Sequence, residues 1–233
     1  MRILFLDVET TGLNPLEDRV VEIGANLYCT DTKRTLRSCS FLTTDDTIKI
    51  SPQITAINKI SQEMLDKNGV DFKSVLPLLT DNFVRRSDFL CAHNAPFDRG
   101  FLEAELKRFG YPIWNKPWID TCVDLPFPET LTTRKLTYLA VEHGFLNPFP
   151  HTALSDVLTT QKILGEYDVA KIISRSETPN ITIVALVDYA NREKASKRGY
   201  RWAAGTKRWM KVIKETELAL EREAAGFEIE VLK

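Results

Sequence analysis

Cysteine and histidine are scarce in this chain, and long apolar runs are absent. Among 233 residues there are 4 cysteines and 3 histidines. The cysteines are scattered without a Cys-x-x-Cys pair, which predicts reduced thiols rather than disulfides or a zinc site. No apolar run approaches the roughly 20 residues of a membrane span, and the N-terminal run is too short for a signal peptide. We therefore expect a cytoplasmic protein that binds no membrane.

Net charge is nearly absent as well. The 31 Lys and Arg residues balance 32 Asp and Glu residues, which leaves a formal charge of -1. Any binding to nucleic acid must therefore depend on local patches of charge. With 43% hydrophobic residues the chain has enough apolar material for a core, and its length suits one large domain or a medium domain plus a small one.

The apolar pattern predicts an α/β fold. Residues 2–8, 19–29 and 34–43 are strand-like and joined by short polar turns, which favours an antiparallel meander. Further strands are expected at 88–92 and 117–122, and helices at 71–86, 97–109, 133–144 and 153–167. Three strands followed by strand–helix alternation indicate a mixed sheet with helices packed on it.

The composition changes near residue 174, and residues 174–180 are typical of a linker. We expect a first domain over 1–174 and a small α+β domain over 175–233. Residues 192–214 of the small domain hold nine Lys or Arg and one acid, whereas residues 215–230 hold six acids and one Arg; a helix is expected at 215–225.

Two tryptophans within the basic stretch allow two interpretations. Trp202 and Trp209 could assist the basic residues in gripping nucleic acid, with phosphates on the cations and a base on an aromatic ring. Alternatively they form the core of the small domain, with the charges as its solvated rim. We favour the core, because so small a domain needs large aromatic side chains inside.

The segment LDVETTGL, residues 6–13, places two acids at the end of an apolar run. Residues two apart on a strand point to the same face, so Asp7 and Glu9 project together. Two close carboxylates remain ionised at low cost only with a cation between them, unless one takes a proton. A solvated surface pair is the alternative. Gly12 allows the backbone to approach whatever binds there.

Two more acids stand where helices are expected to begin. Asp98, in HNAPFDRGFL at 93–102, either belongs to a functional site or only stabilises a helix dipole. Asp156 follows His151 by five residues in HTALSD, a pairing that is weak evidence alone. All these segments lie at strand ends or helix starts, the edge where α/β sheets hold ligands.

Four acids converging at that edge make a site for hard divalent cations, which prefer oxygen ligands. Two Mg²⁺ ions, or Mn²⁺ in their place, about 4 Å apart can hold both the attacking and the leaving oxygen of a phosphodiester. A neutral histidine beside them can take the proton from the attacking water. The residues thus predict metal-dependent phosphodiester hydrolysis.

The motifs LDVETTGL, HNAPFD and HTALSD, in this order and at these separations, resemble the DEDDh branch of the DnaQ-like 3′→5′ exonucleases. The resemblance implies an RNase H-like fold with a five-stranded mixed sheet. It implies His151 as the general base, since its place five residues before Asp156 marks the histidine branch. The metal-binding acids that it implies are Asp7, Glu9, Asp98 and Asp156.

The resemblance also implies contacts to the substrate. Positions that contact the 3′-terminal nucleotide in the family correspond here to Thr10, Thr11, Leu13, Asn94 and Phe97. Where the family usually has His-Gly after a short helix, this chain has Asn58 and Lys59, a departure that leaves the acids untouched. Asp120 and His143 fall in matching segments, and we expect both to be structural.

The expected activity is hydrolysis of DNA from single-stranded or frayed 3′ ends to nucleoside 5′-monophosphates, with two Mg²⁺ ions and His151 as base. One alternative is a 3′→5′ exoribonuclease, because the motifs serve both sugars. Another is a non-catalytic nucleic-acid-binding or adaptor subunit of a replication or repair complex, which would have no use for the intact acids and histidine. A proofreading subunit docked on a polymerase through residues 175–233 is a third.

Overall fold

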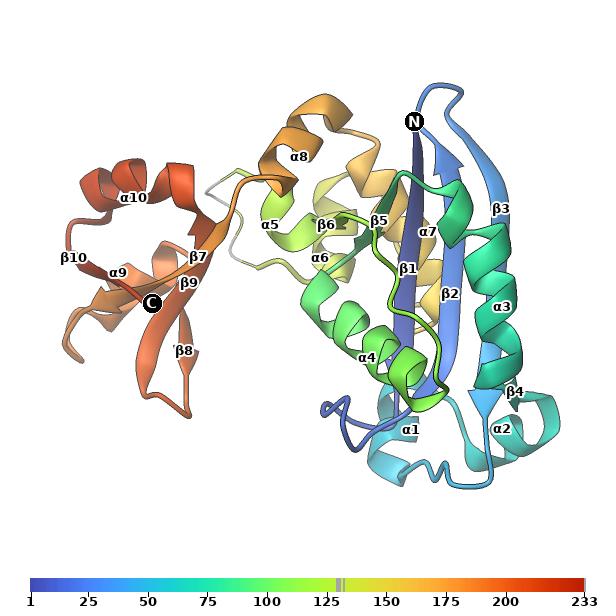
Figure 1. Cartoon of the computed structure of the whole chain (residues 1–233). Helices are drawn as coiled ribbons and strands as arrows, with labels where there is room; N and C mark the ends of the chain where they lie inside the picture. Colours follow the sequence, from blue (N-terminus) through green and yellow to red (C-terminus); the bar gives the residue numbers. More distant parts are fainter. Residues whose placement is uncertain (129–130, 132, 233) are drawn as a thin grey trace. The chain divides into compact units, whose positions relative to one another are not determined.

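Two separate β-sheets, each with its own helices, organise the chain (Figure 1). The computed structural model describes residues 1–128, 131 and 133–232. One unit contains Met1–Cys122 and Leu136–Val169, and the other contains Val123–Lys135 and Ala170–Lys233. Within the described residues, no helix combines the length and apolar character that a membrane crossing requires.

The first unit is built on a mixed sheet. In spatial order its strands are β4 (Val70–Asp71), β3 (Arg34–Thr44), β2 (Val20–Cys29), β1 (Arg2–Thr10), β5 (Phe89–Ala92) and β6 (Trp118–Asp120). The first three strands of the chain form the antiparallel meander, and β5 and β6 continue the sheet in parallel with β1. The predicted α/β class is confirmed. The two-residue β4 makes the sheet six-stranded rather than five-stranded, because it pairs with the end of β3.

Helices cover both faces of this sheet, with α3 and α4 on one face and α7 on the other (Figure 1). Leu4, Leu6 and Val8 of β1 pack in one core with apolar side chains of α3 and α4. The intervening residues of β1 face α7. The helical segments of this unit are α1 (Pro52–Asn58), α2 (Gln62–Asn68), α3 (Phe72–Asn82), the 3₁₀ turn η1 (Val84–Arg86), α4 (Ala95–Arg108), α6 (Leu136–Glu142) and α7 (Ala153–Leu164), while α5 (Thr121–Asp124) straddles the two units.

Several boundaries differ from those expected. The helix expected over 71–86 ends at Asn82, and a separate 3₁₀ turn follows Phe83. The helix α4 begins two residues earlier than expected, at Ala95. The segment 174–180 is not a linker throughout, because α8 (Val169–Ser176) occupies its start and a strand begins at its last residue.

The second unit has a four-stranded antiparallel sheet. Its spatial order is β10 (Glu228–Val231), β7 (Asn180–Leu186), β9 (Arg208–Lys214) and β8 (Arg201–Ala203). Its helical segments after α8 are α9 (Arg192–Lys197), the 3₁₀ turn η2 (Glu215–Glu217) and α10 (Leu218–Ala225). The ion pair of Lys214 with Asp124, with side chains 2% and 3% exposed, joins β9 to the 123–135 segment inside this unit.

The prediction that both tryptophans fill the core of this unit is wrong. Tyr200 is fully buried there and packs with Ile183, Ala195 and Ile229. Trp209 only flanks this cluster, and Trp202 is 53% exposed. The reason is position: Trp202 lies on β8, the edge strand of the sheet.

Candidate active site

The two acids of the first motif lie near the end of β1, on the face of the sheet that α7 covers. Asp7 stands opposite Gly24 of β2, and Glu9 stands opposite Glu22. Directly paired residues share one face of a sheet, so these three carboxylates point the same way. A β-bulge follows between Glu9 and Thr10, where the register shifts.

Asp98 reaches β1 from the first turn of α4. Its carboxylate is 2% exposed, and its Oδ1 accepts a hydrogen bond from the backbone N–H of Val8 at 3.0 Å. Val8 lies between Asp7 and Glu9, so this bond fixes α4 against the strand that carries both acids. The helix starts after Asn94, which takes the left-handed conformation with φ of 70°.

Asp156 comes from the first turn of α7. Its Oδ2 accepts from the backbone N–H of His151 at 3.0 Å, and its Oδ1 accepts from the side-chain amide of Asn147. The backbone of His151 is left-handed, with φ of 62°, and its side chain is exposed. Asp156 thus holds the turn that presents the imidazole.

Three of these residues come together closely. Ligand atoms of Glu9, His151 and Asp156 all lie within 4.8 Å of one another. They come from β1, the turn before α7 and α7 itself, across nearly 150 residues of sequence. Carboxylate oxygens are the ligands that hard divalent metal ions prefer, and an imidazole beside them can exchange a proton with a bound water.

The acids repel one another in this setting. Burial, together with the carboxylates of Asp98 and Asp156, raises the pKa of Asp7 well above its usual range. Burial, with Asp156 and Glu22 nearby, raises the pKa of Glu9 to about 7. Burial raises the pKa of Asp98 and of Asp156 as well, although hydrogen bonds from Val8 and from Asn147 partly oppose the two shifts.

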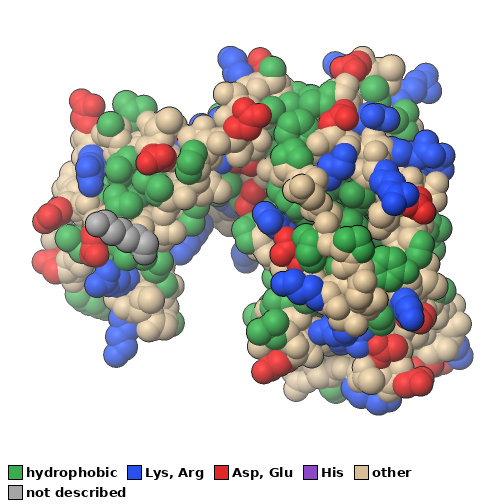
Figure 2. Space-filling view, in the orientation of Figure 1, with side chains coloured by type: hydrophobic (Ala, Val, Ile, Leu, Met, Phe, Trp, Pro, Cys, Tyr) green, Lys and Arg blue, Asp and Glu red, His purple; other side chains and the backbone are tan. Residues whose placement is uncertain are grey.

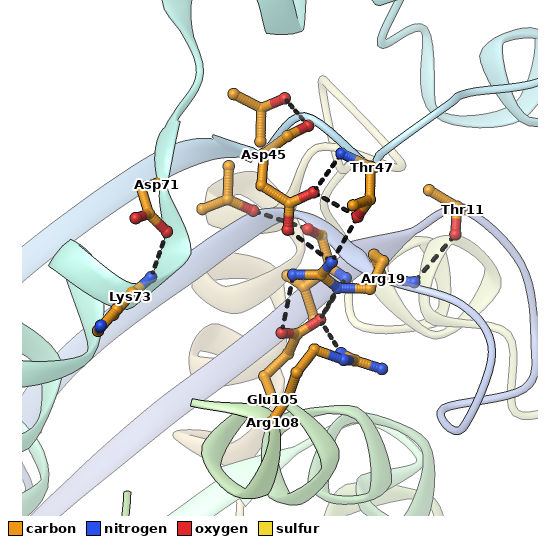
Figure 3. A network of polar contacts seen from close by, with 11 residues as sticks. Thr11, Arg19, Asp45, Thr47, Asp71, Lys73, Glu105 and Arg108 are labelled. Carbon is orange, nitrogen blue, oxygen red and sulfur yellow. Dashed lines mark hydrogen bonds and ion pairs between the residues drawn. The ribbon is translucent and has the colours of Figure 1, made fainter. Parts of the chain in front are cut away.

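The loop after β1 is anchored through Arg19 (Figure 3). The backbone N–H of Arg19 donates to the Thr11 hydroxyl at 2.9 Å, and the N–H of Thr11 donates to the Arg19 carbonyl at 2.9 Å. The Arg19 guanidinium donates two hydrogen bonds to the carboxylate of Glu105 in α4, at 2.8 and 3.3 Å. It also contacts Asp45 and Thr47, on the segment after β3. Glu105 is 1% exposed, so this is a buried tie between the loop and α4.

Within this loop the predicted substrate contacts differ in exposure. The Thr10 hydroxyl donates to the Gly12 carbonyl, and Thr10 is buried. Leu13 is 84% exposed, so its side chain is open to a ligand. A Cβ on Gly12 would come within 2.4 Å of the Asp18 carboxylate. The group that approaches Gly12 is thus part of the loop itself.

The other two predicted contacts lie at the start of α4. The backbone N–H of Asn94 donates to Asp120 Oδ1 at 3.0 Å. The Phe97 ring packs on Phe101, with ring centroids 4.9 Å apart, and it borders the main core of the unit.

Two residues of this region escaped the sequence analysis. Glu22 is 7% exposed; its Oε2 accepts from the N–H of Ala153, the first residue of α7, at 3.2 Å, and its Oε1 accepts from Ser40 at 2.8 Å. Asn147 bonds both Asp156 and Ser155. Strand pairing with Glu9 could have pointed to Glu22, but no local pattern marks Asn147.

Asp120 and His143, which we expected to have structural roles, form hydrogen bonds with nearby groups of the same unit. Asp120 accepts from the backbone N–H groups of Asn94 and Cys122. His143 contacts the Leu139 carbonyl at 2.6 Å and the Tyr167 hydroxyl at 2.8 Å.

Asn58 and Lys59, which replace the usual His-Gly pair of the family, fit the local backbone. Asn58 is buried and accepts from the N–H of Ile60, and Lys59 is left-handed with φ of 64°. A left-handed position suits the glycine that the family usually has there.

A mixed sheet in this order, with acids and a histidine gathered at the end of its central strand, defines an RNase H-like nuclease domain. The RNase_T exonuclease family model matches residues 4–164. Over 165 residues, the chain is 35% identical to a PolC-type DNA polymerase III of Thermotoga petrophila. This alignment covers 68% of this chain and 11% of that protein. It is 39% identical over 102 residues to the DNA polymerase III subunit epsilon of Treponema pallidum, covering 43% and 44% of the two chains.

Solved structures give the same fold. The nuclease domain of 3′hExo, described as a DEDDh family member bound to rAMP, aligns with a TM-score of 0.60 and 22% identity. The alignment covers 71% of this chain and 90% of that one. The chain belongs to the RNase_T exonuclease family, the DnaQ-like 3′→5′ exonucleases. It spans only about a tenth of the length of its PolC-type relatives.

Proposed function

We propose that this protein is a metal-dependent 3′→5′ exonuclease that hydrolyses DNA, from single-stranded or frayed 3′ ends, to nucleoside 5′-monophosphates. The convergence of Glu9, His151 and Asp156 within 4.8 Å carries the proposal. Membership of an exonuclease family and relatives named as DNA polymerase III components support the reaction and the choice of DNA.

The donor set fits a pair of Mg²⁺ ions, with Mn²⁺ as a substitute. Hard divalent cations prefer carboxylate oxygens. Burial, and after it the repulsion between neighbouring carboxylates, raises the pKa of Asp7 and Glu9, and bound cations would favour their ionised forms. The residues that would hold them are Asp7, Glu9, Asp98 and Asp156. When bound, such ions polarise the phosphate and stabilise both the attacking and the leaving oxygen.

The protein's own groups supply orientation and proton transfer. In our proposal the exposed imidazole of His151 takes a proton from the water that attacks phosphorus in line. The carboxylate of Asp156 fixes that imidazole through the backbone N–H of His151, at 3.0 Å. The bond from Val8 to Asp98 keeps the acid of α4 in register with Asp7 and Glu9.

We assign binding of the 3′ end of the substrate to the segments beside these acids. We assign contact with the 3′-terminal nucleotide to Thr10, Thr11, Leu13, Asn94 and Phe97. The exposed side chain of Leu13 supports its assignment to a base contact. Because the hydroxyls of Thr10 and Thr11 are already bonded inside the loop, we expect these two residues to act by shaping the loop.

One experiment tests reaction, polarity and metal site together. The purified chain is incubated with a 5′-labelled single-stranded DNA oligonucleotide in Mg²⁺ or in EDTA. We expect a ladder that shortens from the 3′ end in Mg²⁺ only, and no ladder for Asp7→Ala. Glu63→Ala, which removes an exposed acid of α2, is the matched control and should cleave normally. Near wild-type turnover of Asp7→Ala would remove that residue from the metal site.

RNA is the second candidate substrate, because the structural neighbour 3′hExo is described with rAMP bound. Matched DNA and RNA oligonucleotides in the same assay distinguish the two. Failure on both would favour the non-catalytic adaptor, which the complete set of acids and histidine argues against.

The remaining assignments concern the domains of the chain, its partners and its location. We assign the exonuclease to residues 1–174 and an accessory role to residues 175–233, through which a polymerase or repair complex could dock. Pull-down of polymerase subunits with and without 175–233 tests this docking. We place the protein in the cytoplasm on its cysteine pattern.

A further inference from the structure

An exposed pair of tryptophans marks one side of the second unit. Trp202 on β8 and Trp209 on β9 are directly opposite each other in the antiparallel pair. Their ring centroids are 5.8 Å apart and the rings are tilted by 59°. Trp209 in turn stands opposite Ala185 of β7. One indole, that of Trp209, therefore lies against the unit's core, while Trp202, 53% exposed, extends beyond it at the sheet edge.

The pair borders an open groove of about 420 Å³. It is lined by the end of β7 and the residues after it, 184–188, and by Trp202, Lys207, Arg208 and Trp209. Grooves of this volume accommodate a small molecule or a single nucleotide. An apolar aromatic floor beside cations is the combination on which single-stranded nucleic acids bind, because every base has a face that can stack.

The charges around the groove favour an anionic ligand at one end. Lys207 has no acidic partner among the described residues, and Arg208 pairs with Glu230 at 3.2 Å, with both side chains more than 40% exposed. An ion pair this exposed is weak, so Arg208 can leave Glu230 for another anion. Figure 2 shows Lys and Arg side chains at the lower end of this unit, where Figure 1 draws the β8–β9 hairpin.

The groove is also lined by one acid, Asp188, which is already hydrogen-bonded. Asp188 accepts two hydrogen bonds of 2.8 Å from Asn191, one from the backbone and one from the side chain. The next residue, Tyr189, is 80% exposed, with the Arg192 guanidinium 3.8 Å above its ring. The acid of the groove is therefore already paired, and we expect the phosphate beside Lys207.

We propose that this groove binds single-stranded nucleic acid, with a base stacked on Trp202 and the adjacent phosphate on Lys207 and Arg208. The proposal rests on the proposed function in one respect, namely that the ligand is the strand being degraded. Three of the other cations in the basic stretch are already engaged by acids. Arg198 and Lys211 share Glu221, and Lys214 is buried against Asp124. The cations of the stretch that line the groove itself are Lys207 and Arg208.

Direct binding measurements on the full chain test the proposal. Asp7→Ala is used as the background so that the strand is not cut, and fluorescence anisotropy of a 5′-labelled oligothymidylate gives Kd. We expect Trp202→Ala to weaken binding about tenfold, since stacking on an aromatic ring contributes this order of affinity per base. Trp202→Phe keeps a ring and should retain most of the affinity. Leu220→Ala, which removes another exposed apolar side chain of this unit, is the control and should bind normally.

Salt dependence adds an independent readout. Lys207→Ala should reduce the slope of log Kd against log salt by about one, as expected when one phosphate contact is lost. Affinities of Trp202→Ala and Lys207→Ala within twofold of the background would overturn the proposal. So would loss of polymerase-subunit capture by Trp202→Ala with unchanged oligonucleotide affinity, which would make the groove a protein-binding site. Because the assay needs no cleavage, an inactive wild type with a Trp202-dependent Kd would refute the proposed function and leave this inference standing.

Discussion

At the scale of single residues, the imidazole of His151 differs from the other groups of the site in being exposed. Its left-handed backbone turn and its bond to Asp156 hold it beside Glu9. A group that exchanges protons with water needs such access, whereas metal ligands do not. The two kinds of residue should therefore respond differently to removal.

We predict that His151→Ala lowers kcat by about a hundredfold or more, the usual contribution of a general base. Mg²⁺ affinity, measured by isothermal titration calorimetry, should change little, because all four acids remain. His143→Gln is the matched control, since the ring of His143 bonds the Leu139 carbonyl and the Tyr167 hydroxyl, which are not part of the site. Unchanged turnover of His151→Ala at neutral pH would contradict the assignment.

Glu22 has a different role, as a positioning residue. Its carboxylate ties the first N–H of α7 to β2, with Ser40 as a second partner. Asp156 lies in the same first turn of α7. Losing this tie should shift Asp156, and small displacements of catalytic groups are costly in rate.

We predict that Glu22→Ala lowers kcat about tenfold to a hundredfold in a folded protein. Glu22→Gln, whose amide oxygen still accepts one hydrogen bond, should lose less. Ser40→Ala removes only the hydroxyl partner and serves as control. Folding is checked by circular dichroism, and wild-type kcat in Glu22→Ala would show that the tie is not needed.

Some of the site was predictable at this scale and some was not. The alternation of Asp7 and Glu9 on a strand follows from local geometry, and so does the placing of Asp98 at a helix start. Glu22 is different, because its partner Ala153 is 131 residues away and is brought near only by the packing of α7 on β2. A contact of that range leaves no local trace in one sequence.

At the scale of elements, the packing of α7 on β2 depends on Gly24. A Cβ at this position would lie 2.5 Å from the Ala153 carbonyl carbon and 2.6 Å from the Leu154 nitrogen. Both atoms belong to helix backbone, which cannot move aside as a flexible side chain would. The close approach brings the first turn of α7, with Asp156, over the acids of β1.

We predict that Gly24→Ala lowers the free energy of unfolding by about 1–3 kcal/mol, the usual cost of overpacking, and lowers activity with it. Gly100→Ala is the matched control. Gly100 lies in α4, where an added Cβ would meet a side-chain carbon of Pro15 at 3.7 Å, an ordinary contact distance, and alanine favours helix. Urea unfolding measures both variants. A Gly24→Ala protein as stable as the wild type would mean that α7 can shift without cost.

Most elements of the first unit could be predicted because their apolar periodicity is strong. The failures have physical causes. Tyr200 fills the second core in place of the tryptophans because β8 is an edge strand, and edge status is not visible in a single sequence. The helix expected over 71–86 is interrupted at Phe83, where φ of -122° leaves the helical region although the apolar spacing continues.

At the scale of the whole molecule, the near-zero net charge conceals an uneven distribution. The acids of the site crowd together, whereas a buried Glu105 is held by both Arg19 and Arg108. In the second unit Glu221 is paired with two cations, which keep its pKa below the usual value in spite of burial. These two buried acids are thus balanced by neighbouring cations, whereas the site gathers several acids together.

This imbalance makes stability depend on pH and on metal. Burial and mutual repulsion raise the pKa of Asp7, Asp98 and Asp156, and raise that of Glu9 to about 7. An acid whose folded pKa exceeds its unfolded value binds protons more tightly in the folded state. Its contribution to stability is therefore complete below the unfolded pKa, near about 4, and is lost as pH rises toward the folded pKa.

We predict that in EDTA these groups make the protein less stable at about pH 8 than at about pH 5. Mg²⁺ should raise the melting temperature more at the higher pH, because the cation binds the ionised carboxylates of the folded state. Differential scanning calorimetry in EDTA and in Mg²⁺ at both pH values measures the effect. Glu9→Gln removes one titrating group without changing its shape, so it should flatten the EDTA profile and reduce the Mg²⁺ shift together. If Mg²⁺ stabilised wild type and Glu9→Gln equally at both pH values, the cation would bind elsewhere, and the carboxylates of β1 would lose their assignment as its ligands.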